Sequence, residues 1–374
     1  MFRSLRAAGL VFITLILAGC GDFERFLNDS TASIPQPGSG GKVAVLLPLS
    51  GDLASLGAEM RNAVTLAMAD QPSELEVQFF DTQSTAAGAQ SAGAQARSFG
   101  AGLVLGPLIG ANIEPARSGL GNGPSMVSFS NDVTKASPGN YIFGVTPANG
   151  TKRILQYAST QGKRNIGILY PDDNFGRASF AAATEIAPSL GINIVAAISY
   201  SPAAGREGAS SRQTAAQEMG RRRSEIDGLF IPDGGGRLRE IASLAFFYRL
   251  DPGSEQYLGT QRMDDPSLTT EPALNGANFS AIQGTRAQFE SRFAAQYGST
   301  PRSTSITAYD AMLMAASLNG NYSTGSLTNG GGFTGVLGTY RLNSNGTTER
   351  QMAIKEIGPS GIRVVEAAGS SFLF

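Results

Sequence analysis

The chain has 374 residues, with 29 lysines and arginines against 30 aspartates and glutamates, no histidine and one cysteine. This balance of charge excludes the basic surface that nucleic-acid binding requires, and the length suggests about two domains. The lack of histidine excludes Ser-His-Asp and Cys-His catalysis, as well as zinc sites built on histidine and cysteine. We expect no enzymatic activity, cofactor or metal.

The first residues have the composition of a secretion signal. Arg3 and Arg6 precede an apolar run over residues 7–18, which is shorter than the roughly 20 residues that span a bilayer. The run ends in Leu17-Ala18-Gly19-Cys20, which resembles the lipobox of bacterial lipoproteins, whose cysteine is lipidated and becomes the new N-terminus. Residues 1–19 are thus expected to be a signal peptide and Cys20 a lipid anchor. An ordinary secretory peptide with an incidental cysteine is the alternative.

The lipobox resemblance implies a periplasmic protein that acyl chains hold on a membrane. Gly21, in place of an aspartate, resembles an outer-membrane address, which favours the outer membrane over the inner one. Residues 20–41 are then the anchor and a tether that ends in proline, glycine and serine. Such a segment is a flexible coil that spans roughly 25 Å, so the folded body would stand off the membrane surface.

From Lys42 the chain alternates short apolar runs with segments of helical periodicity. Residues 43–47 form an apolar run that is typical of a strand buried on both faces, and an amphipathic helix follows over residues 53–67. Strands are predicted at 75–80, 103–105, 126–129, 166–170, 192–198 and 226–231, and helices at 86–99, after Asn112, and at 152–160, 179–186, 215–223 and 238–248. Strands that alternate with helices predict parallel sheets, and the restart after residue 147 predicts two lobes. Beyond residue 260 we expect helices at 286–297 and 305–318 and strands at 336–341 and 352–357.

Several segments resemble the type I periplasmic binding proteins of the leucine/isoleucine/valine-binding family. They are residues 42–51, 56–57, 61–63, 103–108, 166–170, 175–176 and 307–310. The resemblance implies an α/β fold of two Rossmann-like lobes with parallel central sheets, joined by a hinge that the chain crosses several times. It also implies a first lobe of residues 42–147 and 277–335, and a second lobe of residues 148–276 and 336–374.

A second resemblance is to the penicillin-binding-protein activator lipoproteins, a branch of the same fold that docks on peptidoglycan synthases. Residues 79–82 with 102–108, and residues 244–248 with 257–260, look like that branch.

In type I proteins the solute lies between the lobes, where strand C-termini and helix N-termini meet. The resemblance implies these ligand-binding candidates: Ser50, Gly51, Gly110, Ala111, Ser130, Asn131, Asp132, Phe175, Asp233, Arg237 and Glu240. Gly110 and Ala111 would let the backbone approach a ligand, whereas Asp132 would repel a ligand carboxylate. Asp233 or Glu240 could pair with a ligand ammonium group, although a solvated loop or helix acid is the alternative for both.

Other charged and glycine-rich segments have simpler interpretations. Asp172 and Asp173 could form a carboxylate pair or a set of calcium ligands, but a solvated turn is favoured. Residues 221–223 are three arginines, which we interpret as a charged helix end or a contact with a partner or with peptidoglycan. Residues 119–123 are not a dinucleotide fingerprint, because the third glycine comes one position too early.

Two functions remain open. The first is a solute receptor, which binds an amino acid or a similar small polar ligand and delivers it to an ABC permease. The second is an interaction module that docks on and stimulates a peptidoglycan synthase. The first is the commoner use of the fold, whereas the lack of hydroxyl donors in residues 107–111 and the sequence of residues 244–248 favour the second.

Overall fold

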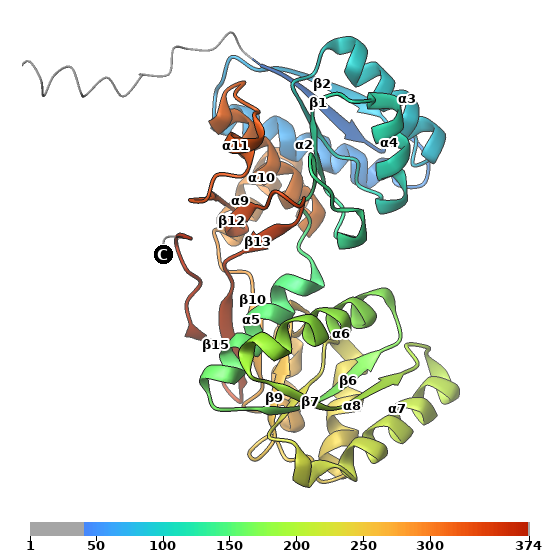
Figure 1. Ribbon diagram of the computed structural model, residues 1–374, viewed down its shortest axis with the longest axis vertical. Helices are drawn as coiled ribbons and strands as arrows, with labels where there is room; N and C mark the ends of the chain where they lie inside the picture. Colours follow the sequence, from blue (N-terminus) through green and yellow to red (C-terminus); the bar gives the residue numbers. More distant parts are fainter. Residues whose placement is uncertain (1–40, 373–374) are drawn as a thin grey trace, which may run out of the picture. The chain divides into compact units, whose positions relative to one another are not determined.

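The computed structural model describes residues 41–372, so the predicted signal peptide, Cys20 and the tether as far as residue 40 lie outside the described residues. The described chain forms two parallel sheets with helices on both faces (Figure 1). We name the part built on the first sheet lobe one and the part built on the second sheet lobe two. This arrangement confirms the predicted α/β fold with two lobes and parallel central sheets.

Lobe one has a five-stranded sheet in the order β2-β1-β3-β4-β5, and all its pairings are parallel. Its strands are β1 (Lys42–Leu47), β2 (Glu76–Asp81), β3 (Leu103–Leu105), β4 (Ser125–Ser128) and β5 (Asn140–Ile142). Its helices are α2 (Ala54–Asp70), α3 (Ala86–Phe99), α4 (Ile113–Leu120), α9 (Arg286–Tyr297), α10 (Ser303–Leu318) and α11 (Thr324–Leu327). A small antiparallel sheet of β11 (Phe333–Gly335), β12 (Gly338–Leu342) and β13 (Thr348–Arg350) packs on this lobe.

Lobe two has a seven-stranded sheet in the order β15-β14-β10-β9-β8-β6-β7. Its parallel strands are β6 (Asn165–Pro171), β7 (Asn193–Tyr200), β8 (Gly228–Phe230), β9 (Gln256–Gly259) and β10 (Asn278–Ala281), and the antiparallel β14 (Ala353–Gly358) and β15 (Gly361–Glu366) complete one edge. Its helices are α5 (Pro147–Thr160), α6 (Asn174–Ile186), α7 (Gly205–Gly220) and α8 (Gly235–Phe247). Short 3₁₀ turns lie at Gly110–Asn112, Val133–Lys135, Ala187–Leu190, Arg223–Glu225, Gln261–Met263, Pro266–Thr270 and Pro272–Leu274.

The apolar run of β1 is buried because the sheet of lobe one has helices on both faces. Val43, Val45 and Leu47 pack in a core with α2 and α10, whereas Ala44 and Leu46 pack in a second core with α3 and α4. Successive side chains of a strand point to opposite faces, so a strand covered on both faces must be apolar throughout. Lobe two follows the same rule, with α7 and α8 over one face and α5 and α6 over the other.

Several predicted helices start too late in the sequence, because the apolar period does not reveal their caps. Helix α5 begins at Pro147 and not at residue 152, with the Thr146 hydroxyl accepting a hydrogen bond from the Asn149 N–H (3.4 Å). Helix α6 begins at Asn174 and not at residue 179, with Asp173 accepting from the Gly176 N–H (2.8 Å). Polar first turns of this kind follow Ser, Thr, Asp or Asn caps. Helix α7 covers residues 205–220 and not 215–223 for the same reason: its first half is polar.

The last part of the chain is divided between the lobes. Tyr340 and Leu342 of β12 lie in the core of lobe one, whereas β14 and β15 join the sheet of lobe two. The predicted limits of the lobes stay a proposal. Because β12 packs on lobe one, we propose that the chain passes from lobe one to lobe two for the last time near residue 350, and not at residue 336.

Candidate functional site

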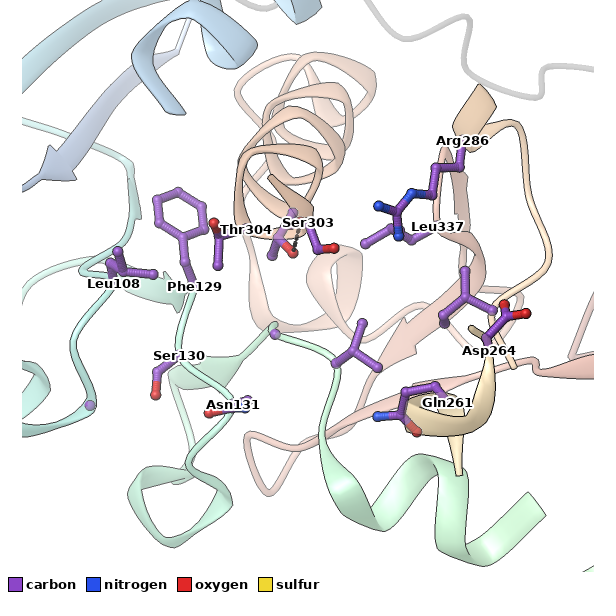
Figure 2. Close-up of a pocket in the computed structure, with 15 residues that line it drawn as sticks. Leu108, Phe129, Ser130, Asn131, Gln261, Asp264, Arg286, Ser303, Thr304 and Leu337 are labelled. Atoms are coloured by element: carbon purple, nitrogen blue, oxygen red, sulfur yellow. Dashed lines mark hydrogen bonds between the residues drawn. The ribbon is translucent and has the colours of Figure 1, made fainter. Parts of the chain in front are cut away.

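A cavity of about 480 Å³ lies where the chain passes between the lobes. Its lining comes from the loops after β3 and β4, the turn after β9, the connections between the lobes, and the first turns of α9 and α10 (Figure 2). The lining residues are Leu108, Gly110, Phe129, Ser130, Asn131, Gly144, Val145, Gln261, Asp264, Ile282, Arg286, Ser303, Thr304, Thr307 and Leu337. The volume is in the range of small-molecule binding sites.

Five large apolar side chains form walls of the cavity: Leu108, Phe129, Val145, Ile282 and Leu337. They belong to loops of lobe one and to two connections between the lobes. These side chains would therefore shield a hydrocarbon or aromatic group inside the cavity from water on several sides. Removal of apolar surface from water is the main favourable contribution to binding such a group.

Polar groups gather at the first turns of two helices. Ser303 and Thr304 begin α10 and line the cavity, and the Glu59 carboxylate already lies at this helix end, where it accepts hydrogen bonds from the Arg302 N–H (2.6 Å) and the Ser305 hydroxyl. Arg286 begins α9, and its Nε donates to Glu290 Oε1 at 2.7 Å. Figure 2 shows the Arg286 guanidinium group directed into the cavity on the side where Ser303 lies. This side of the cavity favours an anionic group.

Gln261 and Asp264 follow β9 and line another side of the cavity. The Asp264 carboxylate accepts hydrogen bonds from Lys355 Nζ at 3.0 and 2.8 Å, so a protein cation already balances its charge. The Gln261 amide is neutral and offers one acceptor and one donor group.

Three of the predicted ligand-binding residues line the cavity: Gly110, Ser130 and Asn131. A Cβ at Gly110 would lie 3.1 Å from Ser130 Oγ and 3.2 Å from Asp132 Cβ, so a larger residue there would require these side chains to shift. Asp132 does not line the cavity; it accepts from the Thr134 N–H at 3.1 Å and its hydroxyl at 2.6 Å, and so caps a 3₁₀ turn. Ala111 is exposed and outside the lining. Ligand contact by any of these residues stays a prediction.

Ser50 and Gly51 belong to a turn that Asp81 holds. The Asp81 carboxylate accepts from Ser50 Oγ (2.6 Å), the Leu49 N–H (2.9 Å) and the Gln83 N–H (2.7 Å). Burial raises the pKa of Asp81, but these hydrogen bonds outweigh it, and the pKa lies below its ordinary value. Gly51 has a φ of 77°, which favours glycine. Neither residue lines the cavity, and both have a structural role in this turn.

Phe175, Asp233 and Arg237 belong to a charge cluster of lobe two outside the cavity lining. Asp233 is fully buried and accepts from Arg237 Nη2 (2.8 Å) and the Tyr200 hydroxyl (2.9 Å). Burial, together with Asp233, raises the pKa of Tyr200 well above its ordinary value, so the phenol stays a neutral donor. Because Arg237 and Tyr200 occupy the carboxylate, Asp233 has no free charge to offer a ligand ammonium group.

Asp172 and Asp173, which the sequence offered as a carboxylate pair, are both bound to arginines. Asp173 accepts from Arg237 Nη2 at 3.1 Å, and the Arg262 guanidinium lies 3.7 Å from the centre of the Phe175 ring. Asp172 pairs with Arg177 at 2.7 Å. Within the described residues, no group of three histidine, cysteine, aspartate or glutamate side chains could hold a metal ion.

Glu240 has a structural partner as well. Its Oε2 lies 2.8 Å from Nε of Arg212, a side chain that is only 5% exposed. A buried guanidinium needs an opposite charge, so Glu240 serves the stability of lobe two. The candidate acids of the sequence, Asp233 and Glu240, are thus both neutralised by arginines.

The comparison of the chain with protein families is decisive. A family model described as "Periplasmic binding protein" matches residues 41–361. The chain belongs to this periplasmic binding protein family. The predicted resemblance to type I members is confirmed by solved structures. A search of curated proteins finds no match.

Three solved structures illustrate the range of proteins that share this fold. A protein from Rhodospirillum rubrum, described as a branched-chain amino acid ABC transporter, is 16% identical, with a TM-score of 0.73 over 87% of this chain and 100% of that one. The C-domain of LpoA (YraM) from Haemophilus influenzae, a regulator of PBP1A, is 20% identical, with a TM-score of 0.68 over 87% and 100%. A solute binding protein of an ABC transporter from Rhodopseudomonas palustris BisB5, in complex with 3,4-dihydroxybenzoic acid, is 16% identical, with a TM-score of 0.57 over 88% and 96%. At these identities the likeness shows the fold.

The description of the family places the chain with binding proteins of the periplasm. In the described part of the chain, none of the helices has both the length and the apolar character needed to cross a membrane.

The cavity of this periplasmic binding protein also uses residues that the sequence did not single out. Arg286, Ser303 and Thr304 lie in helix first turns; the sequence pattern assigns Arg286 no role and places residues 303 and 304 ahead of the helix. A run of serine and threonine at residues 303–305 ahead of an apolar helix is a signal for an N-terminus, and it could have marked this turn.

Proposed function

We propose that the chain is a lipid-anchored periplasmic solute-binding protein, which holds a small ligand in the cavity and presents it to the permease of an ABC-type importer. The cavity supports this proposal, because its walls come from both lobes and from the connections between them. A ligand there would contact both lobes at once, and a ligand that binds one arrangement of two domains better than another shifts the equilibrium towards it.

Thermal unfolding tests this proposal. The chain from residue 21 onward is prepared without lipid, refolded to remove bound solutes, and heated with amino acids, carboxylic acids or short peptides. A ligand at 100 times its dissociation constant adds about 2.7 kcal/mol to the free energy of unfolding, so the midpoint should rise by several degrees in a saturable way. A folded sample that responds to none of these compounds contradicts the proposal.

A second candidate function is regulation of a peptidoglycan synthase by docking, and an exposed aromatic pair favours it. Phe246 and Phe247, at the end of α8, are 51% and 72% exposed. The ends of α7 and α8 adjoin, since a Cβ on Gly220 would lie 2.6 Å from the Tyr248 carbonyl oxygen. The exposed arginines 221–223 follow α7 directly. Exposed aromatic side chains beside arginines are typical of the residues that dominate binding energy in protein interfaces.

Serine substitutions at Phe246 and Phe247 test the docking function. If the pair contacts a synthase, the double variant should bind the periplasmic part of that synthase at least about 10-fold more weakly, because buried aromatic anchors contribute 2 kcal/mol or more. Val364→Ser is the control, since Val364 is 46% exposed and lies on β15. Equal binding by all three proteins would remove this candidate.

A further inference from the structure

The acidic and the basic residue of the cavity lining differ in how many of their hydrogen-bonding groups remain available to a ligand. Asp264 is the one acidic residue of the described lining, and Lys355 binds both of its carboxylate oxygens. Arg286 is the one basic residue of that lining, and it uses only its Nε, in the bond to Glu290. Its two Nη groups make no hydrogen bond with the described part of the chain. Glu290 balances the charge of Arg286 as Lys355 balances that of Asp264, but the two Nη groups of Arg286 keep hydrogen-bond donors that a ligand can use.

The edge formed by two guanidinium nitrogens suits a carboxylate, which can accept from both in parallel. Glu290 accepts a hydrogen bond from Nε, and Figure 2 shows the guanidinium group of this 52% exposed side chain directed towards the cavity. Ser303 and Thr304 line the same side with two hydroxyl groups. All of these groups stabilise an anion.

A ligand ammonium group would find no comparable partner. Lys355 neutralises Asp264, and the two acids predicted from the sequence, Asp233 and Glu240, are bound to Arg237 and Arg212 outside the cavity. The rest of the lining is uncharged: hydroxyl and amide groups and the five apolar walls. Transfer of an ammonium group into such a cavity without an acidic partner is costly.

From this pattern we infer that the cavity selects a small monocarboxylate with an apolar body and no ammonium group, and that Arg286, with Ser303 and Thr304, holds its carboxylate. The apolar part of the ligand lies against Leu108, Phe129, Val145, Ile282 and Leu337. The inference rests on the proposed solute-binding function and narrows its ligand class from amino acids to des-amino carboxylates.

Three ligands that share one hydrocarbon body separate the possibilities in isothermal titration calorimetry. They are 4-methylpentanoate, its neutral amide, and leucine, which adds only the ammonium group. We expect the carboxylate to bind at least about 10-fold more tightly than either of the others. The amide lacks the negative charge that accepts hydrogen bonds from Arg286, and leucine adds an ammonium group that has no acidic partner in the cavity. Benzoate and benzamide repeat the comparison with an aromatic body.

Arg286→Gln tests the residue that carries the inference. This variant should bind 4-methylpentanoate about 10- to 100-fold more weakly, with little change for the amide. Arg292→Gln is the control, because Arg292 is on the same helix, pairs with Asp70 and does not line the cavity; its affinities should match those of the unmodified protein.

The outcomes distinguish this inference from the proposed function. If leucine binds as tightly as the carboxylate, or if Arg286→Gln binds the carboxylate unchanged, the inference is wrong while solute binding stands. If a folded sample binds none of these compounds but responds to another member of the unfolding panel, the inference alone is wrong; if it responds to nothing in either experiment, both are overturned.

Discussion

Asp310 is a buried acid that holds one wall of the cavity in place. Its carboxylate accepts hydrogen bonds from the N–H groups of Val336 (2.7 Å) and Leu337 (2.9 Å), and Leu337 lines the cavity. Burial raises the pKa of Asp310 from 3.8 to about 6, although these two N–H groups and Arg350 favour the charged form. The folded state therefore binds the Asp310 proton more tightly than the unfolded state does.

This pKa shift predicts a pH dependence of stability. The contribution of Asp310 is most favourable below pH 4, and it declines as the pH rises through 6, because the unfolded chain releases the proton first. Relative to Asp310→Asn, the free energy of unfolding of the unmodified protein should fall by up to about 3 kcal/mol over this range. Urea unfolding of both proteins at pH 4 and pH 7 measures the difference. A difference that stays constant with pH would contradict the assigned shift.

The role of a charged residue cannot be inferred from its amino-acid type alone. Asp233 and Glu240 were candidates for an ammonium site, yet each is bound to an arginine four or more positions away along the chain. Arg286 resembles a solvated helix residue in the sequence, but in the fold it lines a cavity. The role of a charged residue depends on which residues lie next to it in the fold, and the sequence does not show which residues those are.

At the scale of elements, the start of α6 depends on Asp173. This residue caps the helix through the Gly176 N–H and binds Arg237 at 3.1 Å, so it joins the helix to the charge cluster of lobe two. The helix carries Phe180, which stacks on Tyr170 of β6 with ring centres 4.8 Å apart. Loss of the cap should therefore weaken the packing of this layer on the sheet.

Asp173→Ala should lower the free energy of unfolding by about 1–3 kcal/mol, as expected for a lost helix cap and a partly buried charge pair. Asp172→Ala is a matched control one residue away. Its salt bridge to Arg177 is 58% and 53% exposed, so its loss should cost less than about 1 kcal/mol. Denaturant midpoints compare the two variants, and equal losses would show that the cap has no special role.

At the scale of the whole molecule, the proposed attachment to a membrane depends on Cys20, which lies outside the described residues. A serine has no thiol to carry the lipid, so Cys20→Ser should move the full-length protein from the membrane fraction to the soluble periplasmic fraction. Fractionation on a density gradient also separates the outer membrane, where we expect the unmodified protein, from the inner one. A variant that remains with the membrane would refute anchoring through Cys20.

The two-lobed fold itself was within reach of the sequence. The alternation of apolar runs with helical periods predicts parallel sheets covered on both faces, and both sheets have that form. Strands β5, β9 and β10 were missed, although β9 and β10 are central in the sheet of lobe two. Each has only three or four residues, which gives a period little room to appear, although the three-residue β3 was predicted and the six-residue β15 was also missed.

The sequence by itself determined the fold class and the resemblance to type I periplasmic binding proteins, because hydrophobic periodicity and short motifs are local properties of a chain. Only the tertiary structure decided which polar residues share a cavity. Residues 130, 261, 286 and 303 meet there because loops of both lobes and a connection between the lobes bring them together. The fold also decided which acids remain free for a ligand, since electrostatic balance depends on distances of a few ångströms that sequence separation does not specify.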